Sequence, residues 1–204
     1  MKKPVLFIDF EDSFSLNIES ELYRQEVTVE RILFNQFIKD LEGDATKFNE
    51  FKKIILGPGP GHPDEYLNHL IFKKFFNKFL TDSSHFAVGI CLGHQIIGHL
   101  LGLKVIESTS KKHGEAVQYQ VQQGDPCYPN ELKGLALNLQ RYNSLTLGNS
   151  GSTLDPSIFI GLDHLNEIAC LKGSNFLTYQ FHPESVGTKY REEIFSYLVK
   201  CLYN

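Results

Sequence analysis

The chain has 204 residues, a length that suits one α/β domain with a full-sized hydrophobic core, and its formal net charge of −4 is close to balance. The sequence carries no basic stripe that indicates nucleic-acid binding, no basic amphipathic helix typical of a membrane surface, and no apolar run as long as a membrane span. Its four cysteines, Cys91, Cys127, Cys170 and Cys201, lack metal-ligand or CxxC spacing, which favours free thiols in a reducing cytoplasm.

The first half of the chain predicts strands that alternate with helices. Strands are expected, mostly as unbroken apolar runs, at Val5–Asp9, Val27–Leu33, Lys53–Leu56 and Phe86–Ile90. Helices are expected at Phe14–Gln25, Phe37–Leu41, Glu65–Leu80 and Gly93–Leu101. The apolar helix residues expected to face the core are Leu16, Leu22, Tyr23, Leu70, Phe72, Phe75, Phe76 and Phe79. This order predicts a doubly wound, mostly parallel sheet flanked by helices.

The second half of the chain predicts strands without helices between them. They are expected at Leu103–Ile106, Glu115–Val121, Leu135–Leu139, Ile158–Leu162, Glu167–Lys172 and Phe176–Phe181. Because turn residues separate these segments, we expect an antiparallel extension of the sheet. A last helix is expected at Thr188–Leu202, and residues 1–204 are expected to form one domain, since no linker or repeat divides them.

The stretch Ala87–Leu101 predicts a buried strand, a tight turn and a helix, with Cys91 in the turn. The segment Gly89-Ile90-Cys91-Leu92-Gly93 has the spacing of a nucleophile elbow, in which glycines on both sides let the chain pass sharply from strand to helix. Such a turn presents the thiol at the carboxyl end of the sheet and at a helix N-terminus, where the thiolate is favoured. The alternative is an unreactive buried cysteine.

A thiolate nucleophile needs a base, and the segment QFHPES at 180–185 offers His182. Glu184 follows two residues later, so in an extended segment its carboxylate points the same way and orients the imidazole ring. Pro183 stiffens the link between them. The alternative is a loop histidine beside a solvated glutamate. Together with the elbow, this pair predicts a catalytic set of Cys91, His182 and Glu184.

The tetrahedral intermediate of such a reaction needs backbone N–H donors. Leu92, one residue past the nucleophile, is the first candidate donor. The second is Gly59 in the loop GPGPGHP at 57–63, where glycine lets the backbone approach a substrate closely, and Pro60 and Gly61 are further candidates for substrate contact. The alternative interpretation of this Gly/Pro loop is a stiff turn that only connects a strand to a helix.

Three motifs, GICLGHQ at 89–95, QFHPES at 180–185 and LGPGPG at 56–61, closely resemble those of the class I (triad-type) glutamine amidotransferases. The resemblance covers the chain from Asp9 to about Ser185. It implies the α/β fold of that family and a reaction in which Cys91 attacks the side-chain amide of L-glutamine. Ammonia then leaves, and a glutamyl thioester remains for water to hydrolyse.

The resemblance also assigns residues that hold glutamine. Gln95 and the Ser144-Leu145 pair match binding residues of the family. Asn143 stands where the family usually has histidine, a departure that leaves the catalytic groups intact and bears on the contact with a partner. His113 matches a His-Gly pair of the family that is structural or adjacent to the substrate. No metal or organic cofactor is implied for this chain.

Two segments indicate which kind of synthase accepts the ammonia. DFEDSF at 9–14 and GPGPGHP at 57–63 resemble segments in the glutaminase subunits of anthranilate synthase and 4-amino-4-deoxychorismate synthase. The chain after Glu184 is too short for a synthase domain. We therefore expect a hetero-oligomer, in which this subunit delivers ammonia to a separate chorismate-binding synthase. The sequence does not distinguish between tryptophan and folate biosynthesis as the pathway served.

The sequence leaves three other hypotheses open. They are a stand-alone γ-glutamyl hydrolase with the same Cys-His pair, a glutaminase subunit for another acceptor, and a catalytically idle binding module with the same fold. Cleavage of γ-glutamyl peptides without a partner favours the first. Failure of Cys91 to react with a glutamine-analogue electrophile favours the last.

Overall fold

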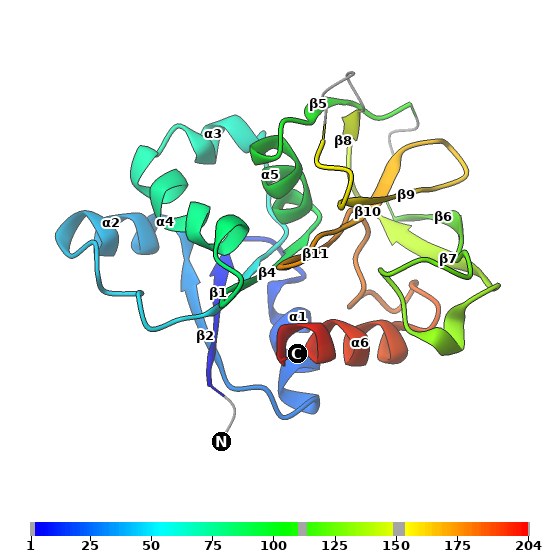
Figure 1. The fold of residues 1–204 in the computed structure, drawn as a ribbon, viewed down its shortest axis with the longest axis horizontal. Coiled ribbons are helices and arrows are strands. Elements are labelled where there is room, and N and C mark those ends of the chain that lie inside the picture. Colours follow the sequence, from blue (N-terminus) through cyan, green and yellow to red (C-terminus); the bar gives the residue numbers. More distant parts are fainter. Residues whose placement is uncertain (1–2, 110–113, 149–153, 204) are drawn as a thin grey trace.

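The computed structural model describes residues 3–109, 114–148 and 154–203, and its centre is a seven-stranded sheet (Figure 1). From one edge to the other the strands are β2 (Val29–Leu33), β1 (Val5–Asp9), β3 (Lys53–Leu56), β4 (Phe86–Ile90), β11 (Phe176–Tyr179), β10 (Ile168–Lys172) and β9 (Phe159–Leu162). Neighbours from β2 to β11 run parallel, whereas β10 and β9 add antiparallel pairs. The predicted mostly parallel sheet with an antiparallel extension is confirmed.

Helices cover both faces of this sheet, because successive residues of a strand point to opposite sides. Val5 and Phe7 of β1 belong to one core cluster, and Leu6 and Ile8 belong to the other. One face is covered by α1 (Ser15–Arg24) and α6 (Arg191–Tyr203), and the other by α2 (Phe34–Gly43), α4 (Leu70–Thr81) and α5 (Leu92–Leu100) (Figure 1). Short helical pieces lie at α3 (Pro63–Leu67) and η1 (Asn130–Leu132).

Two small antiparallel ribbons lie beside the main sheet (Figure 1). They pair β5 (Lys104–Glu107) with β8 (Leu145–Gly148) and β6 (Glu115–Gln120) with β7 (Ala136–Arg141). The sequence did not predict β8, because so short a strand shows little alternation and depends on its partner. Residues 142–144 connect the two ribbons, between the end of β7 and the start of β8.

The prediction of one continuous helix at Glu65–Leu80 is wrong, because two helices, α3 and α4, occupy this range. They are separated by Asn68 and His69, and His69 has an extended conformation with φ −77° and ψ 96°. The break turns Leu70, expected in the core, to solvent with 68% of its surface exposed. The phenylalanines of α4 are buried as expected.

The inward face of α1 also differs from the prediction. Ile18 and Leu22, one helical turn apart, form its buried stripe. Leu16 and Tyr23, both expected inside, are 62% and 55% exposed. The stripe is narrow because α1 contacts the sheet on one side only.

Within the described ranges, every helix is too short or too polar to cross a lipid bilayer. The four cysteines are free and buried.

Candidate active site

The carboxyl ends of β1, β3, β4 and β11 lie at one edge of the parallel sheet, where the loops that follow them meet. In open α/β sheets, ligands bind in the crevice outside this edge. The turn after β4 carries Cys91, the loop after β3 carries Gly59, and the segment after β11 carries Gln180 and His182. The fold therefore brings together residues that are far apart in the sequence.

Cys91 lies in the turn between β4 and α5 with φ 52° and ψ −103°, a conformation that residues other than glycine rarely adopt. Its N–H donates to the Tyr179 carbonyl at 2.8 Å, which anchors the turn to β11. A Cβ on Gly93 would overlap the Leu56 carbonyl, and one on Gly89 would lie 2.6 Å from the Gly93 carbonyl oxygen. The turn thus has the strained geometry of a nucleophile elbow.

His182 and Glu184 contact each other across a turn, with Nδ1 of His182 2.6 Å from Oε1 of Glu184. The Ser185 N–H donates to the His182 carbonyl at 3.2 Å, and Pro183 occupies the second turn position, where proline is favoured. The Thr188 hydroxyl donates to the same carbonyl at 2.7 Å. The extended segment expected here is therefore wrong, although the side chains face each other as the spacing predicted.

The charges beside His182 outweigh its burial and favour a protonated ring. Its side chain, like those of Glu184 and Cys91, is almost completely buried. Burial alone lowers the pKa of His182, but the Glu184 carboxylate and the hydrogen-bonded Cys91 sulfur together raise this pKa well above its ordinary value of 6.5. With Nδ1 at Glu184, Nε2 is the ring nitrogen left for Cys91.

Two aromatic side chains that the sequence analysis did not single out pack against His182. The ring centroids of Phe14 and Tyr142 lie 4.9 Å and 5.1 Å from that of His182, and 4.8 Å from each other. Phe14 is held by the turn after β1, in which Asp9 accepts a hydrogen bond from the Ser15 hydroxyl at 2.5 Å. The segment from Asp9 to Phe14 was a visible signal, but only its spatial position shows that it covers the imidazole ring.

Both predicted oxyanion donors lie beside the Cys91 turn. A Cβ on Gly59 would overlap the Cβ of Phe10 and lie 2.9 Å from Cδ2 of Leu92, so the Gly/Pro loop packs on the start of α5. Leu92 is the first residue of α5, and its N–H therefore has no acceptor inside the helix. Their role toward a substrate oxygen stays a prediction.

The outer part of the Gly/Pro loop is held in place by α3. The Tyr66 hydroxyl donates to the Pro60 carbonyl at 2.9 Å, and Glu65 accepts from the His62 N–H at 2.8 Å. Gly61 has φ +80°, in the left-handed region that glycine adopts without strain. Pro60 and Gly61 are exposed, so they stand at the rim of the site.

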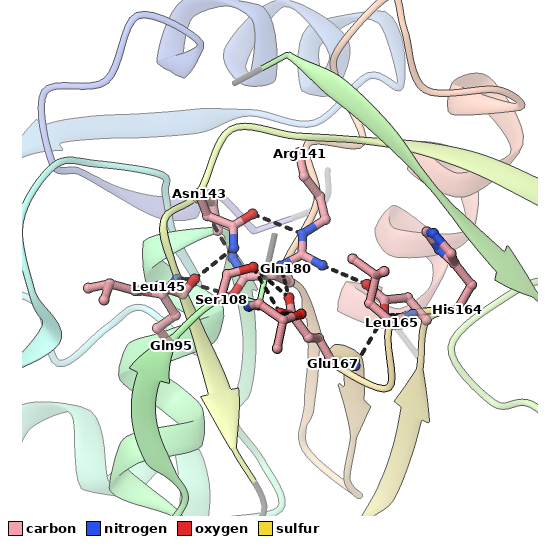
Figure 2. Close-up of polar contacts among 12 residues, drawn as sticks. Gln95, Ser108, Arg141, Asn143, Leu145, His164, Leu165, Glu167 and Gln180 are labelled. Carbon is pink, nitrogen blue, oxygen red and sulfur yellow. Dashed lines mark hydrogen bonds and ion pairs between the residues drawn. The ribbon is translucent and has the colours of Figure 1, made fainter. Parts of the chain in front are cut away.

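Gln95 is almost completely buried on α5. Its Nε2 atom donates to the Leu145 carbonyl at 2.8 Å and to Oε1 of Gln180 at 3.1 Å (Figure 2). These bonds use both hydrogens of the amide nitrogen, and the contact of Gln95 with a substrate stays a prediction. Ser144, beside Leu145, is exposed.

Gln180 is a third residue whose place the sequence analysis missed. It is completely buried, and its Nε2 atom donates to Sγ of Cys91 at 3.9 Å. It stands in the segment that was examined for His182, two positions earlier, but nothing local shows that its side chain points to the sulfur.

The histidine nearest to Cys91 in the sequence, His94, lies behind the site. Its Nδ1 atom is 2.8 Å from the Thr178 hydroxyl, and burial lowers its pKa to about 3. A neutral ring held in this way serves packing. His113, matched by the family resemblance, lies outside the described residues.

One group among the described residues has the ligand types of a metal site, namely the buried Asp125, Cys127 and Cys170. Asp125 already accepts hydrogen bonds from the Tyr119 hydroxyl at 2.6 Å and from the Cys127 N–H at 2.8 Å. Burial raises the pKa of Cys127 well above its ordinary value, which disfavours the thiolate that a metal needs. The cluster therefore fits an internal hydrogen-bond network better than a metal site.

The family described as "Glutamine amidotransferase class-I" matches residues 6–201. The chain is 31% identical over 195 residues to anthranilate synthase component 2 of Cyanidium caldarium, with 90% of this chain and 91% of that protein covered. It is 28% identical over 207 residues to the component 2 protein of Cyanophora paradoxa, with 97% and 99% covered.

Solved structures share the fold. The glutamine amido transferase of Methylobacillus flagellatus superimposes with a TM-score of 0.73 at 13% identity, covering 99% of this chain and 96% of that one. A glutamine amidotransferase of Thermotoga maritima gives a TM-score of 0.63 at 19% identity, covering 89% and 76%. At these identities the likeness concerns the arrangement of helices and strands.

Proposed function

Because this chain belongs to the class I glutamine amidotransferases, we propose that it hydrolyses L-glutamine with Cys91, His182 and Glu184 and delivers the ammonia to a partner synthase. The observation that carries the catalytic assignment is the buried His182–Glu184 pair, at 2.6 Å, beside the strained Cys91 turn. This arrangement has a nucleophile, a base and an orienting carboxylate in contact.

The first half-reaction forms a thioester. The thiolate sulfur of Cys91 attacks the carbonyl carbon of the side-chain amide, and the electron pair of the C=O bond moves onto oxygen. The imidazolium of His182 gives its proton to the amide nitrogen as the C–N bond breaks, and ammonia leaves. The N–H groups of Leu92 and Gly59 stabilise the transient oxyanion.

The second half-reaction restores the enzyme. Neutral His182 takes a proton from water while the water oxygen attacks the thioester carbon, and the C–S bond then breaks. Glutamate leaves, and the thiolate–imidazolium pair forms again. Glu184 holds the ring through Nδ1 and favours the charged form of the imidazole.

Glutamine is held by its amino acid end and its amide. The candidates are Oε1 of Gln95, the Ser144-Leu145 segment, and the rim residues Pro60 and Gly61. What supports this assignment is that Gln95 and Leu145 share a hydrogen bond at 2.8 Å close to the Cys91 turn.

The acceptor of the ammonia is a chorismate-using synthase that makes anthranilate or 4-amino-4-deoxychorismate. Relatives that align along most of their length carry the name anthranilate synthase component 2, which supports this choice. The reaction takes place in the cytoplasm, since buried free thiols suit a reducing compartment.

The chemistry is tested with the tagged chain purified from its own cell lysate, so that any synthase stays bound. Cys91→Ala should lower glutamine hydrolysis about 10³-fold or more, because the covalent step is lost. Cys201→Ala, in the distant α6, is the matched control and should keep wild-type turnover. Full activity in Cys91→Ala would show that the proposed mechanism is wrong.

The partner is tested on the same preparation by mass spectrometry. Recovery of a chorismate-using synthase, followed by formation of anthranilate or aminodeoxychorismate from glutamine and chorismate, supports the proposal. Recovery of a synthase with another acceptor overturns the choice of partner and keeps the glutaminase chemistry. Cleavage of γ-glutamyl peptides by the isolated chain would instead identify a stand-alone hydrolase.

A further inference from the structure

Arg141, the last residue of β7, is buried between two carboxylates. Its Nη1 atom lies 2.6 Å from Oδ2 of Asp163, and its Nη2 atom lies 2.6 Å from Oε2 of Glu167 (Figure 2). The Leu165 N–H donates to Asp163 at 2.8 Å, and the Thr109 N–H donates to Glu167 at 2.6 Å. We call this set the Arg141 cluster. It is rigid, because moving one member leaves a buried charge without its partner.

A chain of hydrogen bonds leads from the Arg141 cluster toward the nucleophile (Figure 2). Nε of Arg141 donates to Oδ1 of Asn143 at 2.9 Å, and Nδ2 of Asn143 donates to the Leu145 carbonyl at 2.7 Å. The same carbonyl accepts from Gln95, on the helix that begins directly after Cys91. The segment that carries Leu145 is thus held from both sides.

The direction of these bonds is determined, because arginine only donates and a carbonyl only accepts. Arg141 therefore takes the amide oxygen of Asn143, and the amide nitrogen faces Leu145. An aspartate at this position has nearly the same shape and keeps an acceptor for Arg141. Its second oxygen, however, would face the Leu145 carbonyl, so an attraction becomes a repulsion.

We propose that Asn143 is a positioning residue for glutamine binding, which ties the Leu145 carbonyl to the Arg141 cluster and thereby sets the Ser144-Leu145 segment relative to Cys91. The inference rests on the proposed function, since glutamine is taken to bind between that segment and the nucleophile. Asn143 is 5% exposed and acts through the backbone of Leu145.

The test measures glutamine hydrolysis by the purified complex for Asn143→Asp, Asn143→Ala and Asn143→His. Asn143→Asp should raise KM for glutamine about tenfold and leave kcat within about threefold, because a binding contact is displaced while the reacting groups stay in place. Asn143→His should raise KM less, since a neutral imidazole has one acceptor and one donor. Asn138→Asp, at an exposed position on β7, the strand that precedes Asn143, is the matched control and should leave KM unchanged.

Alkylation of Cys91 separates positioning from general support of the fold. Iodoacetamide needs no glutamine-binding groups, so its rate in Asn143→Asp should stay within about twofold of wild type, whereas a glutamine-analogue electrophile should react about tenfold more slowly. Equal slowing of both reagents would overturn the inference, because Asn143 would then only support the fold.

The remaining outcomes also test whether Asn143 positions the glutamine-binding segment. Unchanged KM in Asn143→Asp overturns the inference while the proposed function stands. If Asn143→Asp does not fold, Asn143→Ala removes the same donor without adding a charge, and an unchanged KM in that variant has the same meaning. A wild-type complex that does not turn over glutamine overturns the proposed function and, with it, this inference.

Discussion

Nδ1 of His182 lies 2.6 Å from Oε1 of Glu184, and the two residues are 1% and 2% exposed. A contact this short between a carboxylate and an imidazole is charge-assisted, and its burial keeps water from screening it. The carboxylate therefore determines both the orientation and the charge of the ring. The first prediction below tests both effects together, and the second tests the charge.

Glu184→Gln removes the charge and keeps the size of the side chain. We expect kcat for glutamine hydrolysis to fall about 10²- to 10⁴-fold, because a neutral amide no longer favours the imidazolium or its correct tautomer. Steady-state kinetics of the complex measures the change. Glu50→Gln, at an exposed position, is the control and should behave as wild type. Activity of Glu184→Gln equal to that control would contradict the role of the carboxylate.

The pH dependence of stability reports the charge of His182 directly. Burial lowers its pKa, but Glu184 and Cys91 raise it further, so the folded-state pKa lies well above the ordinary 6.5. The folded protein thus holds a proton that the unfolded chain releases above pH 6.5. The stabilisation from this group is complete below that pH and is lost as the pH rises through the folded-state pKa.

Urea denaturation of wild type and His182→Gln over this pH range measures that contribution. We expect the difference in free energy of unfolding between the two proteins to shrink as the pH rises above 6.5. A difference that stays level or grows as the pH rises above 6.5 would mean that His182 is neutral in the folded protein.

Gln180→Glu tests the donor that faces the nucleophile. One carboxylate oxygen can still accept from Gln95, but the N–H that lies 3.9 Å from Sγ of Cys91 is replaced by an acceptor. We expect the rate of Cys91 alkylation by iodoacetamide at neutral pH to fall about tenfold, because a negative charge takes the place of the donor beside the nucleophilic sulfur. Gln123→Glu, an exposed control, should keep the wild-type rate. An unchanged alkylation rate in Gln180→Glu would show that the Gln180 donor does not assist Cys91.

Gly93→Ala tests whether the sharp turn after Cys91 requires glycine. The added methyl group would overlap the Leu56 carbonyl, a backbone atom that cannot move aside without shifting β3. We expect a loss of about 3 kcal/mol or more in the free energy of unfolding, at the upper end of overpacking in cores. Gly43→Ala, where nothing lies within 4 Å, should be neutral. Equal denaturation midpoints for the two variants would show that the elbow accepts a side chain.

Much of the fold follows from local patterns. The bounds of β1, β3 and β4 agree with the apolar runs of the sequence, because a parallel strand covered on both faces needs such a run. The elbow follows from Gly89 and Gly93, whose spacing around Cys91 is a local requirement of the turn. Local patterns failed to predict β8, which depends on its partner strand. They also failed to predict the change of direction between α3 and α4.

The sequence by itself determined the family, the sheet edge at which the site forms, and the pairing of His182 with Glu184, since these depend on residue types at short spacings. Only the tertiary structure decided that Gln180 faces Cys91 and that Asn143 joins Leu145 to a buried arginine. Hydrogen bonds of this kind link elements far apart in the chain, and their direction depends on which donors and acceptors the packed fold brings within reach.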